Sequence, residues 1–165
     1  MGFRTDVVVI GGGQAGLAMS YCLTIKGIDH VVLERGRLAE RWRSERWDSL
    51  RLLTPNWQTR LPGFHYDGAD PDGFMTAGDV VNFFERYARS FSPPVESQTS
   101  VTNVWQSDGG LRVATSNGEW RARAVVIATG DCDMPVIPRI SARLDPGILQ
   151  LAPSRYRRPD MSRRT

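Results

Sequence analysis

Three glycines near the N-terminus give the clearest chemical signal in this sequence of 165 residues, because their spacing is that of a phosphate-binding turn. They form the pattern Gly11-x-Gly13-x-x-Gly16. The first glycine permits a tight turn, the second lets the backbone approach a pyrophosphate, and the third lets a helix pack closely on a strand. A helix that begins at Gln14 would offer its free N–H groups and the positive end of its dipole to the phosphates.

An acidic residue, Glu34, follows the glycines after a helix-sized interval, at the end of an apolar run. In dinucleotide-binding units a carboxylate at this place accepts hydrogen bonds from the hydroxyls of an adenosine ribose, and its charge disfavours a 2′-phosphate. For the glycine spacing alone, a turn without a ligand is the alternative interpretation. The combination of strand, glycines, helix and carboxylate favours a dinucleotide site.

The residues that position these groups form one β-turn-α-β unit in the sequence. Residues 6–10 and 30–34 are short apolar, β-branched runs, which is typical of parallel strands buried on both faces. Residues 14–26 between them have an apolar helical face that ends at Gly27, a favourable C-terminal cap. The connection between the two strands is expected to be right-handed.

The rest of the sequence predicts a second helix, a small antiparallel sheet and one more parallel strand. Residues 35–75 are rich in arginine, tryptophan and turn residues, and we expect irregular structure with one helical turn around 39–46. The further expected elements are a helix from 76 to just before Ser92, strands at 99–106, 110–116 and 119–124 joined in part by Asn117-Gly118, and a buried parallel strand at 124–130. The predicted fold class is therefore α/β, a Rossmann-like domain with a parallel sheet and a small antiparallel β-meander.

Composition and charge exclude several other classes of protein. The chain is 41% hydrophobic and 24% charged, which is typical of a soluble globular domain and not of a disordered chain. The net charge of +3 comes from five arginines within residues 155–165, so no nucleic-acid partner is predicted. We find no signal peptide or membrane-spanning run and expect a cytoplasmic protein. Cys22 and Cys132 lack metal-ligand or redox spacing, and the two histidines are isolated, so no metal site is predicted.

Several motifs together resemble the flavin-containing and Baeyer–Villiger monooxygenase group of the two-dinucleotide-binding flavoproteins. The resemblance covers nearly all of residues 4–158. Its motifs are Gly11-Gly-Gly-Gln-Ala-Gly16, Leu33-Glu-Arg35, Arg41-Trp-Arg43 through Trp47-Asp-Ser-Leu-Arg-Leu-Leu-Thr-Pro55, Leu61-Pro-Gly63 and Ala128-Thr-Gly130. Many flavoproteins share the first and last of these, and the stretch between Arg41 and Pro55 is the more specific part.

The resemblance implies that the chain binds FAD and assigns positions to it. The implied FAD-binding residues are Gly11, Gly13, Gln14, Ala15 and Gly16 at the pyrophosphate, Glu34 at the ribose, Arg35 and Val101 at the adenine, Arg41, Trp42 and Thr54 toward the isoalloxazine, and Ala128, Thr129 and Gly130 beside the adenosine half. In full-length members of this group NADPH reduces the flavin, which then activates O2 to oxygenate a small molecule. Because the cofactor performs the chemistry, no catalytic side-chain constellation is expected.

The sequence departs from this group in two ways. It contains no second Gly-x-Gly-x-x-Gly for NADPH, and it lacks the late Gly-Asp segment that completes the FAD domain in the group. We therefore expect an incomplete FAD-binding domain at 1–150 and an Arg-rich linker or tail at 151–165. NADPH-driven turnover is not expected from this chain alone.

Two other functional interpretations are also consistent with the sequence. One is a truncated dinucleotide-binding domain without independent catalysis, acting with a partner chain or as a homo-oligomer. The other, less favoured, is an NAD-dependent dehydrogenase. The sequence lacks the Tyr/Lys or His/Asp arrangement after the sheet that a dehydrogenase would need, and no motif identifies the small-molecule substrate.

Overall fold

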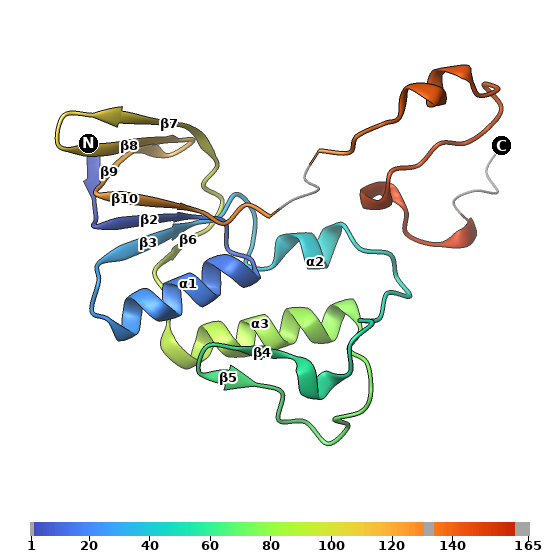
Figure 1. Cartoon of the computed structure of the whole chain (residues 1–165), viewed down its shortest axis with the longest axis horizontal. Helices are drawn as coiled ribbons and strands as arrows, with labels where there is room; N and C mark the ends of the chain where they lie inside the picture. Colours follow the sequence, from blue (N-terminus) through green and yellow to red (C-terminus); the bar gives the residue numbers. More distant parts are fainter. Residues whose placement is uncertain (1, 131–133, 161–165) are drawn as a thin grey trace.

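A four-stranded parallel sheet lies at the centre of the computed structural model, which describes residues 2–130 and 134–160 (Figure 1). Its strand order is β10-β2-β3-β6, and the strands are β2 (Val7–Ile10), β3 (His30–Leu33), β6 (Val95–Glu96) and β10 (Ala124–Ile127). Helix α1 (Gln14–Ile25) connects β2 to β3, which confirms the predicted β-turn-α-β unit. Because the strands are parallel, the carboxyl ends of β10, β2 and β3 lie along one edge of the sheet.

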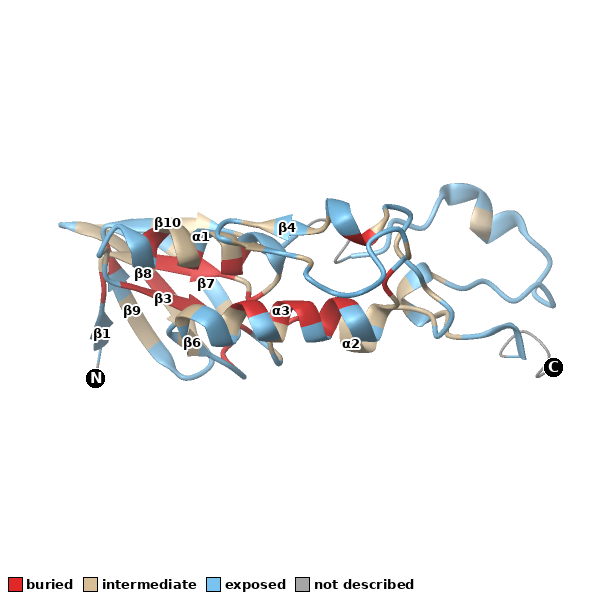
Figure 2. Cartoon of the chain, turned by 90° about the horizontal axis from the view of Figure 1, so that it is seen from below, coloured by how far each residue is buried: buried red, intermediate tan, exposed pale blue. Residues whose placement is uncertain are grey.

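Alternate residues of β2 and β3 face two different layers, which explains why both strands are continuously apolar. Val8 and Val31 pack against a second sheet, whereas Val9 and Val32 pack with Leu23 of α1. All four valines are buried, and Figure 2 shows buried residues in red along β3. Each fully buried valine side chain contributes roughly 1.5–3 kcal/mol relative to exposure. The prediction of strands buried on both faces is confirmed for β2 and β3.

The second sheet contains the predicted meander. Strands β7 (Val101–Ser107), β8 (Gly110–Thr115) and β9 (Gly118–Ala122) are antiparallel neighbours, in the sheet order β1-β9-β8-β7. The hairpin at the predicted Asn-Gly pair is present, but its two loop residues are Ser116 and Asn117, because Thr115 already pairs with Gly118.

Two short strands in these two sheets, β1 and β6, have no counterpart in the sequence-based prediction. Strand β1 (Gly2–Arg4) pairs in parallel with β9, and the ring of Phe3 stacks on Trp120 with centroids 4.7 Å apart. Strand β6 has two residues and joins the parallel sheet beside β3. Strands this short show no alternation of apolar and polar residues, so a pattern search does not find them.

The strand at the end of the meander differs from its prediction. Residues 124–130 were expected to form a buried parallel strand, and β10 indeed pairs in parallel with β2. However, Val125 and Val126 are half-buried and Ile127 is 66% exposed. The physical reason is position: β10 is an edge strand, and none of the described strands pairs with its other side.

Two further helices pack against each other, and the second of them also packs against α1. They are α2 (Glu40–Ser44), within the helical turn expected around 39–46, and α3 (Ala77–Phe91). Figure 1 shows α1 and α3 on the face opposite the second sheet. Leu17 of α1 and Tyr87 of α3 are fully buried in one apolar cluster. The Tyr87 hydroxyl donates to the carbonyl of Pro62 at 3.0 Å, and burial raises the pKa of this phenol well above its ordinary value of 10.0.

The segment before α3 is irregular, as predicted, apart from two small elements. A 3-10 helix occupies Asn56–Gln58, and a two-stranded hairpin joins β4 (Arg60–Leu61) to β5 (Phe64–His65). Gly63 lies in the turn of this hairpin with a φ of +70°. The hairpin carries the loop across α3, where Phe64 packs on Phe83 with ring centroids 5.1 Å apart.

The C-terminal segment, residues 134–160, extends away from both sheets (Figure 1) and contacts the loop that follows α2. It contains two 3-10 helices, Arg139–Arg143 and Pro153–Arg155. The backbone N–H of Asp48 donates to the carbonyl of Arg157 at 2.9 Å, and the Arg157 guanidinium donates to the carbonyl of Arg46 at 2.5 Å. Residues 161–165 of the predicted tail, and Cys132, lie outside the described residues. Among the helices that are described, none is long and apolar enough to cross a membrane.

Candidate dinucleotide-binding site

The turn between β2 and α1 leaves no room for side chains at two of its glycines. Gly11 has a φ of +111°, and a Cβ there would lie 2.5 Å from the carbonyl oxygen of Ala128. A Cβ at Gly16 would overlap the carbonyl oxygen of Gly11. These contacts place the turn tightly against the end of β10 and the start of α1. The roles predicted for the first and third glycines, a tight turn and close helix packing, match this geometry.

Gly13 is different, because the space in front of it is open. It is the N-cap of α1 with a φ of −90°, and a Cβ at this residue would meet no atom within 4 Å. No side chain caps the helix, and the first turn contains no acidic residue. The N–H groups of Gln14 and Ala15 have no intrahelical acceptor. Both residues are exposed, so this helix terminus presents donors and positive dipole charge to a ligand.

Glu34 connects the end of β3 to the glycine turn. Its Oε2 accepts a hydrogen bond from the N–H of Gly12 at 2.6 Å, and its Oε1 accepts one from the N–H of Gly36 at 2.8 Å. The residue is only 8% exposed. Each carboxylate oxygen can accept more than one hydrogen bond, so both keep capacity for ribose hydroxyls. The structure therefore brings Glu34 to the turn, as the sequence predicted.

A charged cluster lies near the carboxyl ends of the same strands. Glu45, at the C-terminal end of α2, accepts from Nε of Arg41 at 2.7 Å and lies 3.9 Å from a guanidinium nitrogen of Arg35. A guanidinium nitrogen of Arg41 lies 3.5 Å from the position that a Cβ of Gly130 would occupy. Glu45 was not identified from the sequence, although its i,i+4 spacing from Arg41 is a recognisable ion-pair signal.

A cavity of about 250 Å³ opens beside the start of α1. Its lining residues are Gln14, Trp42, Leu52, Thr54, Gln58, Thr59, Arg60, Leu61, Val80, Phe83 and Phe84. Trp42 meets Phe84 edge-on at 6.5 Å between centroids, and the guanidinium of Arg46 lies 4.9 Å from the centroid of the Trp42 ring. Six of the eleven lining residues are apolar or aromatic and five are polar, so the cavity offers both ring contacts and hydrogen-bonding groups.

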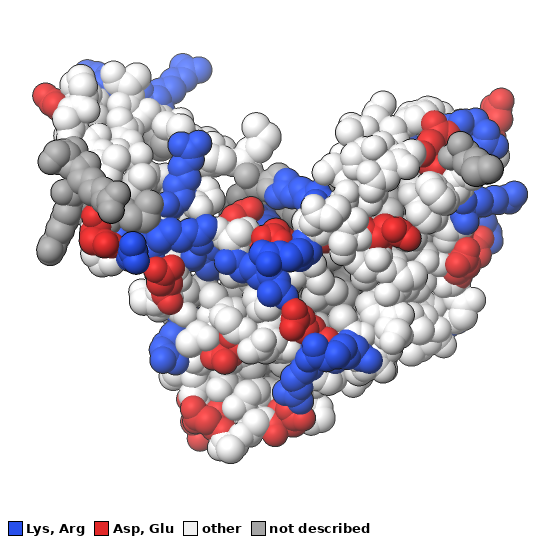
Figure 3. Space-filling view, turned by 180° about the vertical axis from the view of Figure 1, so that it is seen from behind, with Lys and Arg blue, Asp and Glu red and all other residues white. Residues whose placement is uncertain are grey.

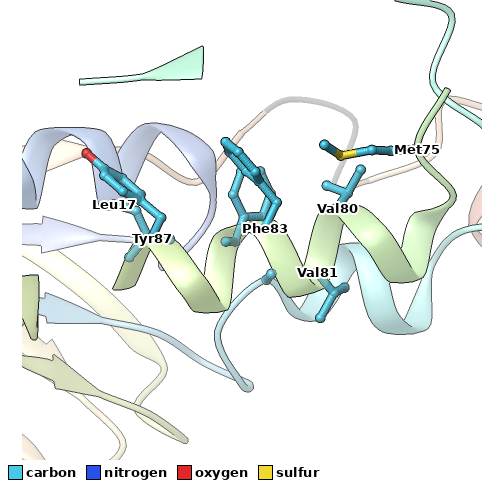
Figure 4. Packing of buried hydrophobic residues seen from close by; sticks show 8 residues of the cluster. Leu17, Met75, Val80, Val81, Phe83 and Tyr87 are labelled. Carbon is cyan, nitrogen blue, oxygen red and sulfur yellow. The ribbon is translucent and has the colours of Figure 1, made fainter. Parts of the chain in front are cut away.

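Three predicted site residues, Gln14, Trp42 and Thr54, meet at this cavity, although they come from three separate segments. The sequence did not single out the wall contributed by α3, because apolar residues at helical spacing are typical of any core helix. Figure 4 shows Val80, Phe83 and Tyr87 on the same side of α3. Tyr87 continues into the core toward Leu17, whereas Val80 and Phe83 also line the cavity.

The remaining predicted residues lie at the borders of the site. Val101 begins β7 and is half-buried, and the preceding Thr99 donates its N–H to the carbonyl of Glu34 at 2.9 Å. Thr129 and Gly130 are exposed beyond the end of β10, and Gly130 has a φ of +71°. These residues lie near the turn, and their roles toward a ligand stay predictions.

Opposite charges are closely paired over the arginine-rich region. Arg43 pairs with Glu85 of α3, and Arg37 pairs with Glu40, whose pKa the Arg37 hydrogen bond lowers to about 2. On the face of the molecule that Figure 3 presents, blue and red side chains are intermingled. Within residues 2–130 and 134–160, no group of three or more His, Cys, Asp or Glu side chains is arranged to hold a metal ion.

The fold and the site define a Rossmann-like dinucleotide-binding domain with an added antiparallel sheet. Residues 8–153 match the family model described as pyridine nucleotide-disulphide oxidoreductase, and the chain belongs to this family. The match includes the glycine turn, Glu34, the cavity and β10, so every element of the candidate site lies within the family region.

The chain is similar in sequence and in structure to flavin monooxygenases, and in sequence to an uncharacterized oxidoreductase. The chain is 39% identical over 155 residues to an uncharacterized CzcO-like oxidoreductase of Geobacillus kaustophilus, covering 93% of this chain and 44% of that protein. It is 34% identical over 142 residues to the indole-3-pyruvate monooxygenase YUCCA6 of Arabidopsis thaliana, covering 82% of this chain and 34% of that protein. A solved flavin-containing monooxygenase from Stenotrophomonas maltophilia superposes with a TM-score of 0.69 at 33% identity, covering 78% of this chain and 39% of that one.

These matches confirm the predicted resemblance and the α/β fold class. The chain has the fold of the FAD-binding domain of flavin monooxygenases. It spans less than half of the length of the curated relatives described above.

Proposed function

We propose that this chain binds FAD, as the FAD-binding module of a flavin-dependent, monooxygenase-like oxidoreductase. One observation carries the proposal: neither the backbone conformation of Gly13 nor a close contact with the protein requires glycine at this position. The open space lies directly in front of the N-terminus of α1, where a pyrophosphate would lie against backbone N–H groups.

The other residues then take places along an extended dinucleotide. Glu34 would hold the adenosine ribose, with Arg35 and Val101 near the adenine. Arg41, which the resemblance assigns toward the isoalloxazine, lies against Gly130 in the structure, so we place it with the segment Ala128-Thr129-Gly130 on the phosphate and adenosine side. We place the flat ring system of the flavin at the cavity beside Gln14 and Thr54, because the rings of Trp42, Phe83 and Phe84 form part of its wall.

FAD, when bound, would supply the redox chemistry, and the protein would bind, orient and shield it. Phe83 and Phe84 would exclude water from one side of the ring, and Glu34 would fix the adenosine end. The segment 1–150 would form this module, and 151–165 would form a linker or tail. NADPH as the reductant, a small-molecule substrate and a cytoplasmic location are part of the same proposal, supported by the family resemblance.

The test is a pair of glycine variants. Gly13→Ala should fold normally, with an apo melting temperature within about 2 °C of wild type, because the added methyl group meets no atom. It should weaken FAD binding at least about tenfold, since the methyl group occupies the place of the pyrophosphate, and a tenfold loss is about 1.4 kcal/mol. Visible absorption of the reconstituted protein and a fluorescence titration measure both effects.

Gly78→Ala is the matched control. Gly78 lies in α3, and a Cβ there would approach Thr76 no closer than 3.7 Å. It should leave the FAD affinity unchanged. The proposal is wrong if the wild-type chain neither retains nor rebinds flavin, or if Gly13→Ala binds FAD as tightly as Gly78→Ala does.

A second candidate function is flavin binding without independent turnover. The sequence contains a single Gly-x-Gly-x-x-Gly, which the proposed FAD site uses. Anaerobic addition of NADPH to the FAD-loaded chain distinguishes the two candidates. Bleaching of the flavin absorption would show independent reduction, and a stable oxidised spectrum would favour the binding module alone. Tight NADH binding without affinity for FAD would instead indicate a dehydrogenase.

A further inference from the structure

The carboxyl ends of three neighbouring strands each carry one part of the candidate site. In the sheet order, β2 with the glycine turn lies between β10 and β3. Glu34 and Arg35 follow β3, and Gly130 follows β10. Ligands of open α/β sheets bind outside these carboxyl ends. A group that connects the β3 side with the β10 side therefore spans the place where the dinucleotide would lie.

Glu45 makes this connection. One of its oxygens is 2.7 Å from Nε of Arg41, whose guanidinium lies against Gly130 on the β10 side. Its other oxygen is 3.9 Å from Arg35 on the β3 side. The side chains of Arg41 and Glu45 are 23% and 24% exposed, so this pair is held more firmly than a fully solvated one. Two arginines and one glutamate keep a net positive charge, as an anion requires.

We infer that Glu45 is a positioning residue that orients Arg35 and Arg41 toward the two sides of the dinucleotide. The inference rests on the proposed FAD site and adds a residue that contacts the arginines and not the ligand. The direction in which FAD affinity changes when Glu45 is removed distinguishes this role from an incidental one. If Glu45 had no positioning role, its carboxylate would only repel the phosphates, so its removal would strengthen FAD binding. As a positioning residue, it holds two long side chains whose ordering would otherwise oppose binding, and its removal weakens FAD binding.

The test compares Glu45→Ala with Glu40→Ala in the full chain. Glu40 begins the same short helix and makes a comparable ion pair with Arg37 at 2.8 Å, and neither Glu40 nor Arg37 is among the proposed FAD residues. Glu40 also accepts from the backbone N–H of Arg37, so a purely structural loss should be at least as large in Glu40→Ala. Dissociation constants for FAD and for ADP, which carries the same pyrophosphate and adenosine, are measured with the apo melting temperature.

We expect Glu45→Ala to weaken both FAD and ADP by about tenfold, with Glu40→Ala within twofold of wild type. Glu45→Gln, which keeps one carbonyl oxygen as an acceptor for Arg41, should recover part of the affinity. Unchanged or tighter binding by Glu45→Ala, or equal losses in Glu45→Ala and Glu40→Ala, would overturn the role of Glu45. If the wild-type chain binds neither FAD nor ADP, the proposed function itself fails and this inference falls with it.

Discussion

The glycine turn and the cavity beside it are built in opposite ways. The turn is formed by consecutive residues, Gly11 to Gly16, and its shape requires that Gly11 and Gly16 have no Cβ atom. The cavity is built by side chains from α1, α2, the 52–61 segment and α3, and its shape depends on the volume that these side chains fill. A binding surface made of backbone tolerates almost no added atom, whereas one made of side chains can repack.

The same contrast separates the parts of the proposed FAD site by their expected sensitivity. Backbone N–H groups at the turn are fixed by the strand and helix that they join. The cavity wall is fixed by contacts such as Phe64 against Phe83 and Trp42 against Phe84, in which several side chains share the packing. Substitutions in the two regions should therefore differ in size, and the following variants measure that difference.

The largest effect is expected from Gly16→Ala. The added Cβ would overlap the carbonyl oxygen of Gly11, a backbone atom that cannot move without displacing the whole turn. Overpacking of this kind costs about 3 kcal/mol or more when the neighbour is rigid, and FAD binding should be lost. Urea denaturation and a flavin titration measure the two effects. A Gly16→Ala chain with wild-type stability and affinity would show that the turn can relax, which contradicts the comparison.

A smaller effect is expected from Phe83→Leu in the cavity wall. Phe83 is 3% exposed, but leucine keeps an apolar side chain and neighbouring rings can shift toward it. We expect a loss of about 1–1.5 kcal/mol in unfolding free energy and a few-fold weaker FAD binding. If Phe83→Leu destabilises the chain as much as Gly16→Ala does, the cavity wall is as rigid as the turn.

The smallest effect concerns the N-terminus of α3, which carries part of the cavity wall. Asp79 accepts from the hydroxyl of Thr76 at 2.7 Å and from its backbone N–H at 2.9 Å, and these hydrogen bonds lower the pKa of Asp79 below its ordinary value of 3.8. A lowered pKa in the folded state stabilises the protein above about pH 3.8, and this stability is lost as the pH falls through the folded-state pKa.

Asp79→Asn should therefore cost up to about 1 kcal/mol at pH 7, the typical size of a capping interaction. Its unfolding free energy should also fall less than that of wild type between pH 7 and pH 3. Denaturation curves at the two pH values measure this, with Asp108→Asn on the exposed β7–β8 turn as the control. An identical pH dependence in Asp79→Asn and wild type would show that the hydrogen bonds between Thr76 and Asp79 do not stabilise α3.

Local patterns explain which parts of the fold were predictable. The strands β2 and β3, the helix between them and the meander all have a periodicity or a glycine spacing that a short window contains. The exposure of Ile127 was not predictable, because an apolar β-branched run looks the same in a central strand and at an edge. The two-residue strand β6 joins the sheet through its pairing with β3, which no local pattern records.

The candidate site also has parts that a local sequence pattern predicts and parts that it does not. Glu34 was selected from the sequence, and it lies at the glycine turn because the β-turn-α-β unit fixes their relation within a few dozen residues; its role toward the ribose stays a prediction. The resemblance to a family selected Trp42 and Thr54; the structure places both at one cavity, and their roles toward FAD stay predictions. The sequence did not identify Glu45, because an Arg–Glu pair at i,i+4 spacing occurs on many solvated helices.

By itself, the sequence determined the backbone part of this protein: a turn that requires glycine, two strands with both faces apolar, and a carboxylate at the end of the second strand. These follow from steric limits and side-chain periods that act over a few residues. Only the tertiary structure decided which side chains line the cavity, that β10 lies at an edge, and that Glu45 connects Arg35 with Arg41. Those outcomes depend on contacts between segments far apart in the chain, whose geometry is fixed by packing and not by local pattern.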